Sequence, residues 1–242
     1  MDEEVLIQKQ LASQTRDEMF ELFTSYYDEV ARTTFDEDLA NKDLVILLRD
    51  SSRKIVAFTT LAVSETRDTA RHVRYIYSGD TITNSDYWGP GHLLRSWFRL
   101  AGSIRAEHPK TNLYWILLVK GHRTYRILNG FFKHYVPRLG QQQDPKLTEL
   151  RDDFCRRKFG IYFDASTGLI RFPTTRGQLA SHLQDEEAFK GKPLVGEFLK
   201  LNPQGGQGVE LACIAELCES NLKSYARAEF ARGMCEHPRK NA

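Results

Sequence analysis

The sequence of 242 residues has few cysteines, no long apolar run and almost no excess charge. Four cysteines without a C-x-x-C pair exclude a disulfide scaffold and favour buried thiols in a reducing cytosol. No segment approaches the roughly 18 consecutive apolar residues that a membrane helix needs. Lys and Arg number 34 against 32 acidic residues, and this net charge of +2 argues against an obligate nucleic-acid binder.

Motifs of several common site types are also missing. The seven histidines form no H-x-x-x-H or H-E-x-x-H pair, so the sequence predicts no metal site. The absence of G-x-S-x-G and G-x-x-x-x-G-K-[ST] argues against hydrolases and nucleotide triphosphatases. The first four residues are acidic where a secretory or transit peptide is basic, so we expect a cytoplasmic protein.

The rest of the composition is that of a folded globular protein. Hydrophobic residues make up 41% of the chain and charged residues 27%, which excludes extensive disorder. The length suffices for a sizeable core. Because no internal repeat or change of composition divides the chain, we predict a single domain over residues 1–242.

Apolar spacing predicts the elements of the first half. Residues 16–30 have the period of an amphipathic helix, and the runs 44–48 and 55–63 flank a polar turn like the strands of a hairpin. Residues 72–83 read as a strand, followed by a glycine turn and a helix. The unbroken apolar run 112–119 predicts a central strand covered on both faces.

The remaining elements are read from weaker patterns. A short helix over about 122–128 is expected to end at Asn129-Gly130 in a left-handed cap. A hairpin is predicted around residues 164–168, a strand within 209–217 and a helix from 221 onward.

The turn over residues 87–93 reads Tyr-Trp-Gly-Pro-Gly-His-Leu and precedes a predicted helix. A helix N-terminus offers unpaired N–H groups and partial positive charge to a phosphate, and glycine lets the anion approach closely. Gly89, Gly91 and His92 can donate N–H groups, whereas Pro90 cannot. The alternative is a turn that only starts a helix at a favoured N1 proline.

This turn resembles that of the GNAT superfamily of acyltransferases. So does the order of elements over about residues 15–135, which is helix, hairpin, strand, glycine turn, helix, central strand, helix. Trp88 and Pro90 replace the Arg or Gln and the basic residue of the family pattern. The resemblance implies an α/β (α+β) fold with a mixed, mostly antiparallel central sheet flanked by helices. Residues 136–242 are then a C-terminal extension that completes the sheet and the acceptor pocket.

The resemblance also implies an activity. This activity is transfer of an acyl group from a pantetheine thioester, either acyl-CoA or an acyl-carrier protein, to an amine of a small molecule. The reaction needs no metal, and the protein can be a homodimer. The alternative is a non-catalytic GNAT-like module that binds an acyl-thioester or a carrier protein. Because Pro90 lacks an N–H and no Lys or Arg lies in the turn, we expect weak dependence on the phosphates of coenzyme A.

By the same resemblance, the backbone of Ile82 and Thr83 pairs with the pantetheine arm. Asp80 and Ser78 are expected on one face of that strand and are candidate catalytic residues, and the Asp80 carboxylate could accept the proton of the amine, directly or through water. In the alternative interpretation, Asp80 follows Gly79 in a β-bulge and only satisfies backbone N–H groups.

The general acid of the family is a tyrosine in a Tyr-x-x-x-Gly-Phe pattern on the helix after the central strand. Tyr125 precedes Gly130-Phe131 with one extra residue, which rotates a helical side chain by about 100°. The alternative is that Tyr125 only packs in the core. The acid would then be Ser78, His122 or water.

Overall fold

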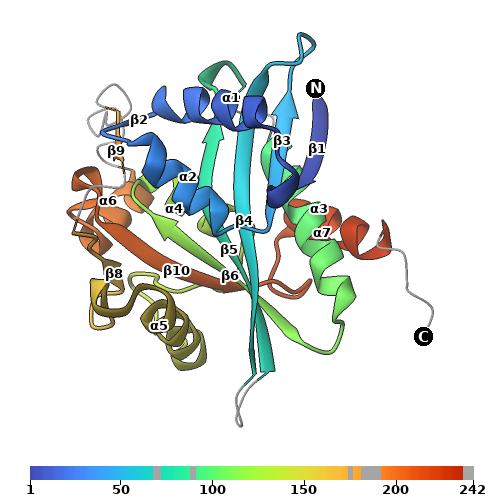
Figure 1. The fold of residues 1–242 in the computed structure, drawn as a ribbon. Coiled ribbons are helices and arrows are strands. Elements are labelled where there is room, and N and C mark those ends of the chain that lie inside the picture. Colours follow the sequence, from blue (N-terminus) through green and yellow to red (C-terminus); the bar gives the residue numbers. More distant parts are fainter. Residues whose placement is uncertain (68–71, 88–90, 174–176, 181–191, 237–242) are drawn as a thin grey trace.

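The computed structural model describes residues 1–67, 72–87, 91–173, 177–180 and 192–236. Within these residues eight strands form one mixed sheet (Figure 1). Across the sheet they are β1 (Asp2–Ile7), β3 (Leu44–Arg49), β4 (Ile55–Arg67), β5 (His72–Thr83), β6 (Asn112–Val119), β10 (Glu210–Glu216), β8 (Leu169–Ile170) and β7 (Phe163–Asp164). Only β5 and β6 are parallel neighbours among these strands.

Helices cover both faces of this sheet. They are α1 (Ser13–Thr24), α2 (Arg32–Ala40), α3 (His92–Glu107), α4 (His122–Phe131), α5 (Pro145–Phe159), α6 (Pro193–Leu201) and α7 (Ser224–Glu236). Single 3-10 turns are η1 (Gln8–Gln10), η2 (Ser85–Tyr87), η3 (Gly160–Tyr162) and η6 (Gly205–Gln207). A two-stranded sheet pairs β2 (Tyr27–Asp28) with β9 (Gln178–Leu179).

The predicted fold class is confirmed: the sheet is mixed, mostly antiparallel and flanked by helices. Strands 72–83 and 112–119 have the predicted bounds, and the hairpins and the C-terminal helix are present. The predicted helix over 16–30 is wrong at its end, because Tyr27 belongs to β2 and a separate helix α2 follows. The predicted cap at Asn129-Gly130 is also wrong, because α4 continues to Phe131 and ends at an extended Phe132.

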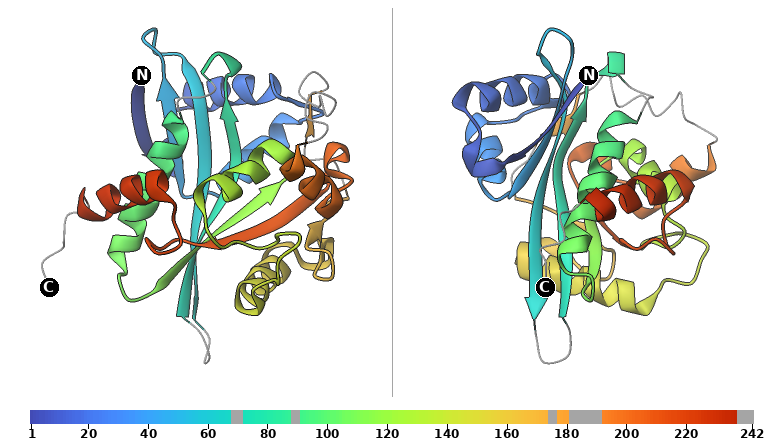
Figure 2. Two further views of the ribbon diagram at one scale, coloured as in Figure 1. Left: turned by 180° about the vertical axis from the view of Figure 1, so that it is seen from behind. Right: turned by 90° about the vertical axis from the view of Figure 1, so that its right-hand side faces the viewer.

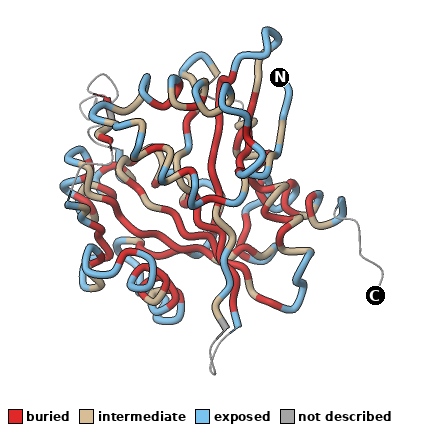
Figure 3. The backbone as a smooth tube through the Cα atoms, in the orientation of Figure 1, coloured by how far each residue is buried: buried red, intermediate tan, exposed pale blue. Residues whose placement is uncertain are grey.

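Alternating side chains divide the core between the two faces. On the first face, Ile46, Trp115 and Cys213 pack with α3, α4, α6 and α7. On the second face, α1 and α2 cover β3 and β4, and α5 covers β5, β6 and β10. Figure 2 shows α1 and α2 on the side of the strands opposite α3 and α7. The buried residues follow the strands between these layers (Figure 3).

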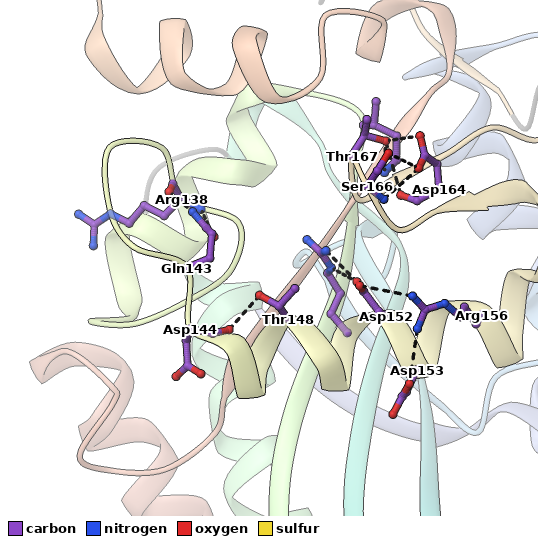
Figure 4. A network of polar contacts seen from close by, with 12 residues as sticks. Arg138, Gln143, Asp144, Thr148, Asp152, Asp153, Arg156, Asp164, Ser166 and Thr167 are labelled. Carbon is purple, nitrogen blue, oxygen red and sulfur yellow. Dashed lines mark hydrogen bonds and ion pairs between the residues drawn. The ribbon is translucent and has the colours of Figure 1, made fainter.

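Helix α5 lies in the C-terminal extension and is fixed by polar contacts (Figure 4). Asp144 caps its N-terminus by accepting from the backbone N–H groups of residues 146 and 147 at 2.9 and 3.2 Å, ahead of Pro145 at N1. Further along, the buried Arg151 is ion-paired with Asp152 at 2.7 Å. The strands β7, β8 and β10 of the extension continue the central sheet.

Two irregularities of β5 prepare the site. Between β4 and β5, Thr59 faces Thr81 and Leu61 faces Ser78, so Gly79 and Asp80 together oppose one residue in a β-bulge. On its other side β5 pairs with β6 only as far as Ser78. The two parallel strands therefore separate beyond Ser78, and β5 runs on to Thr83 without a β6 partner.

Candidate active site

A cavity of about 820 Å³ is lined by residues from both faces of the sheet. Phe23 and Asp38 reach it from the second face, and Leu93 from the first. Residues 77–83 of β5, Ser78 included, and Lys120, just after β6, also line it. The cavity therefore crosses the sheet where β5 and β6 separate, and we call it the through-sheet cavity.

At the first face, the N-terminus of α3 opens into the through-sheet cavity. Gly91 is its N-cap with φ +66°, and Gly91, His92, Leu93 and Leu94 line the cavity. Among the residues that the structure describes, no side chain caps the helix, so its first N–H groups can donate to an anion. Two predicted site residues, Gly91 and His92, thus lie at the cavity, whereas Gly89 lies outside the described residues.

Helix α4 adds positive charge to the same end of the cavity. Its N-cap is Gly121, its first turn contains no acidic residue, and Arg123 and Arg126 line the cavity. Burial, with Arg123 and Arg126, lowers the pKa of His122, which is consequently neutral near pH 7. Two helix N-termini and two guanidinium groups make this end electropositive, which suits a phosphorylated ligand.

Asp80 lies at the crossing point, on the second face of the sheet. Ile82, two residues further, packs with α1 and α2 on that face, and Asp80, Ile82 and Thr83 all line the cavity. Burial raises the pKa of the Asp80 carboxyl to about 7, and the nearby Asp38 adds to this increase. Among the described residues no hydrogen bond or ion pair reaches this carboxylate. The bulge is present, yet the side chain faces the cavity instead of capping backbone groups.

The opposite wall at this point comes from three other elements. Lys120 Nζ lies 3.2 Å from Glu210 Oε1 of β10 and 5.4 Å from the centre of the Tyr27 ring. Tyr27 stacks on Phe23, with ring centres 4.8 Å apart. Burial raises the pKa of the Tyr27 hydroxyl, and so do the charges of Asp80 and Glu210. Tyr27 is therefore protonated at neutral pH and can donate a hydrogen bond into the cavity.

Ser78 does not share a face with Asp80, so that expectation is wrong. The Ser78 hydroxyl accepts hydrogen bonds from the indole N–H groups of Trp97 at 3.1 Å and Trp115 at 2.8 Å. Both indoles belong to the core of the first face. Residues two apart in a regular strand share a face, but the extra residue of the bulge breaks this rule along β5. Ser78, before the extra residue, and Asp80 therefore point to opposite faces of the sheet.

Tyr125 is fully buried and is not among the residues that line the cavity. Its hydroxyl lies 2.8 Å from Glu197 Oε1 and 2.9 Å from the Pro137 carbonyl oxygen, two acceptors for one proton. Burial and the bond to Glu197 raise its pKa. This placement favours the packing interpretation of Tyr125. The cavity side of α4 instead presents residues such as Arg126 and Ile127.

Several charged or titratable residues of the cavity region were not among the sequence-based candidates. They are Tyr27, Asp38, Lys42, Lys120 and Glu210. Only their position in the sequence could have pointed to them. Lys42 and Glu210 lie at the start of a predicted apolar strand, and Lys120 follows the end of another. Asp38 and Lys42 are four residues apart, but no spacing or motif relates this pair to Tyr27, Lys120 and Glu210, which come from other segments of the chain.

Among the described residues, no group of three or more His, Cys, Asp or Glu side chains is placed to hold a metal ion. Within the same residues, no helix combines the length and apolar character needed to cross a membrane.

Solved structures of N-acyltransferases are similar to part of this chain. A probable N-acyltransferase from Enterococcus faecalis is 14% identical over 56% of this chain and 33% of its own, with a TM-score of 0.40. A GNAT family N-acetyltransferase from Escherichia coli, in complex with CoA, is 10% identical over 53% of this chain and 68% of its own, with a TM-score of 0.37. An acyl-CoA N-acyltransferase from Pseudomonas aeruginosa is 17% identical over 54% of this chain and 87% of its own, with a TM-score of 0.39.

This chain thus spans a third of the length of the Enterococcus protein. No protein-family model matches the chain, and no curated protein matches its sequence. The likeness to the solved structures is one of fold and extends over little more than half of the chain.

We predict that Ser78→Ala lowers the free energy of unfolding by about 2 kcal/mol or more, because two buried indole N–H groups lose their acceptor. Urea unfolding followed by tryptophan fluorescence measures the loss. Ser78→Thr retains the hydroxyl and serves as the control. An alanine variant as stable as the wild type would contradict the structural role.

For Tyr125, we predict that Tyr125→Phe lowers the free energy of unfolding by about 1 kcal/mol, through the lost hydrogen bond, and leaves thioester turnover within twofold. Tyr125→Ala should cost about 3–5 kcal/mol because it opens a cavity in the core. Unfolding curves and steady-state rates of free-thiol release measure both effects. A drop of tenfold or more in turnover for the phenylalanine variant, at unchanged stability, would restore Tyr125 as the acid.

Proposed function

We propose that this protein is an N-acyltransferase that moves an acyl group from a pantetheine thioester to an amine of a small molecule. One observation carries the proposal: the through-sheet cavity joins an electropositive end to a carboxylate of raised pKa at the point where β5 and β6 separate. Such a passage can bring a phosphorylated donor from one face of the sheet against an acceptor on the other.

The donor that suits this cavity best is an acyl-CoA. The free N–H groups at the start of α3, with Arg123 and Arg126 of α4, can bind its phosphates. The edge of β5 that has no β6 partner, at Ile82 and Thr83, can pair with the amides of the pantetheine arm. The two arginines supply the cations that the glycine turn lacks. We therefore now expect donor binding to depend on the phosphates of coenzyme A, instead of the weak dependence expected from the turn alone. An acyl-carrier protein remains the second donor to test.

The acceptor end is suited to an amine that enters as a cation. Lys42 is paired with Asp38 and Lys120 with Glu210, and within the described part of the chain Asp80 is a carboxylate of this end without an ion pair. Tyr27 and Phe23 form an aromatic wall beside these charges. The pairing of β2 with β9 joins two distant segments beside this end, and this enclosure supports a small acceptor over a protein.

In the proposed reaction Asp80 takes a proton from the ammonium, directly or through water. The neutral amine attacks the thioester carbonyl and gives a tetrahedral intermediate whose nitrogen still carries an extra proton. The intermediate expels the thiolate and passes this second proton to the departing sulfur, directly or through water. The products are an amide and a free thiol, and the first proton, held by Asp80, returns to solvent. A thiol has a pKa near 8.5, so its anion leaves readily and this route needs no dedicated general acid. Alignment of the two reactants supplies the rest of the acceleration.

We predict amine-dependent thiol release from acyl-CoA, with kcat/KM increasing through an apparent pKa near 7 because Asp80 must be ionised. Asp80→Asn should lower kcat/KM by roughly 10²–10⁴-fold and abolish this titration. A panel of acetyl-, malonyl- and longer acyl-CoA esters with small amines, assayed for free thiol, measures both. A melting temperature at pH 8 that is at least as high as that of the wild type excludes unfolding of the variant. Donor binding without release would instead support the non-catalytic module.

A second prediction concerns the donor phosphates. Arg126→Gln should raise KM for acyl-CoA by roughly fivefold and leave KM for the same acyl group on pantetheine unchanged, because only the former has phosphates to contact Arg126. Arg227→Gln, an exposed arginine of α7 outside the cavity lining, is the matched control. Equal effects of Arg126→Gln on both donors would remove α4 from the phosphate site.

A further inference from the structure

Lys42 is a buried cation between α2 and β3. Its side chain is 0% exposed and is ion-paired with the Asp38 carboxylate. Lys42 Nζ also donates to the Asp38 carbonyl oxygen at 2.9 Å and lies 5.5 Å from the centre of the Tyr77 ring. Because desolvation offsets most of the attraction within a buried ion pair, such a pair adds little net stability.

The ammonium of Lys42 lies directly beneath the bulge that carries Asp80. A Cβ added to Gly79 would stand 2.4 Å from Lys42 Cε and 2.8 Å from Lys42 Nζ. Glycine at position 79 is therefore what admits the lysine, and the lysine supports the backbone one residue before Asp80. Among the described residues no hydrogen bond joins Lys42 to Asp80. The lysine can act on this carboxylate through the backbone and through its charge.

We propose that Lys42 is a positioning residue for Asp80: from beneath the bulge it holds the carboxylate in the through-sheet cavity and favours its ionised form. This inference rests on the proposed function, in which Asp80 is the base. The ion pair carries one charge of each sign next to Asp80, so its two members act on Asp80 in opposite directions. Lys42 favours the ionised carboxylate and Asp38 opposes it.

Among the described residues, four charged groups and one tyrosine act on or face Asp80. They are Asp38 on α2, Lys42 before β3, Lys120 after β6, Glu210 on β10 and Tyr27 on β2. Burial raises the pKa of Asp80 most, Asp38 and Glu210 raise it further, and Lys42 and Lys120 lower it. The lysines thereby keep a buried carboxyl ionisable near neutral pH.

The test is a direct titration of Asp80 in the full chain. Protein labelled with ¹³C at the aspartate carboxyl carbon is titrated by NMR, and the Asp80 signal is assigned from Asp80→Asn. Lys42→Met should raise the Asp80 pKa by roughly one pH unit, and Asp38→Asn should lower it by a comparable amount. Both variants break the same ion pair, so a merely structural role would affect them alike.

The control is Lys110→Met, which removes the same charge from an exposed position outside the cavity lining and should leave the titration unchanged. Shifts of the same sign in the two variants, or no shift in either, would overturn the inference. If Lys42→Met does not fold, Lys42→Gln takes its place in the same comparison, because a lower pKa in Asp38→Asn alone reports only on the charge of Asp38.

Failure of the proposed function gives a different result. Opposite shifts of the Asp80 signal in a protein that releases no thiol would support the role of Lys42 in ionising Asp80 and refute the acyltransferase. Thiol release that depends on Asp80, without opposite shifts, would refute only the role of Lys42.

Discussion

The bulge at Gly79 and Asp80 is the constraint on which the site depends. It reverses the alternation of side chains along β5, so that Ser78 joins the tryptophan core of one face and Asp80 faces the other. The end of β5–β6 pairing at Ser78 leaves the next residues free to line a passage. The extra residue in β5 and the end of its hydrogen bonding with β6 thus open the sheet, and Asp80 lies in the opening.

The charges along the through-sheet cavity follow from which elements meet at each end. Two helices begin at the first face, so free N–H groups and the arginines of α4 gather there. At the second face the ends of β6 and β10 bring Lys120 and Glu210 beside Asp80. In the proposed reaction the anionic donor and the cationic acceptor would prefer opposite ends, and this gradient of charge would orient them toward the crossing point.

Most of the sheet could be predicted from the sequence, because its central strands are long apolar runs bounded by polar turns. Elements such as β1 and α6 were missed, because their patterns are short or weakly periodic. At the site, Asp80 could be proposed from its place before the glycine turn. The contacts of Tyr125 and the face of Ser78 could not, because a shift of one residue in a helix or a strand decides which way a side chain points. Lys42 could not be linked to Asp80 at all, because a tertiary contact joins them.

The raised pKa of Asp80 also has a consequence for stability. Its carboxyl binds a proton more tightly in the folded chain than in the unfolded chain, where its pKa is near 3.9. Its contribution to stability is therefore fully present below about pH 4 and is lost as the pH rises through about 7. The base is ionised only where that contribution has been lost. Lys42 and Lys120 limit the loss, since each favours the ionised carboxylate. The lysines that favour the ionised form needed for the proposed base are therefore also those that reduce the cost of this carboxylate to the fold.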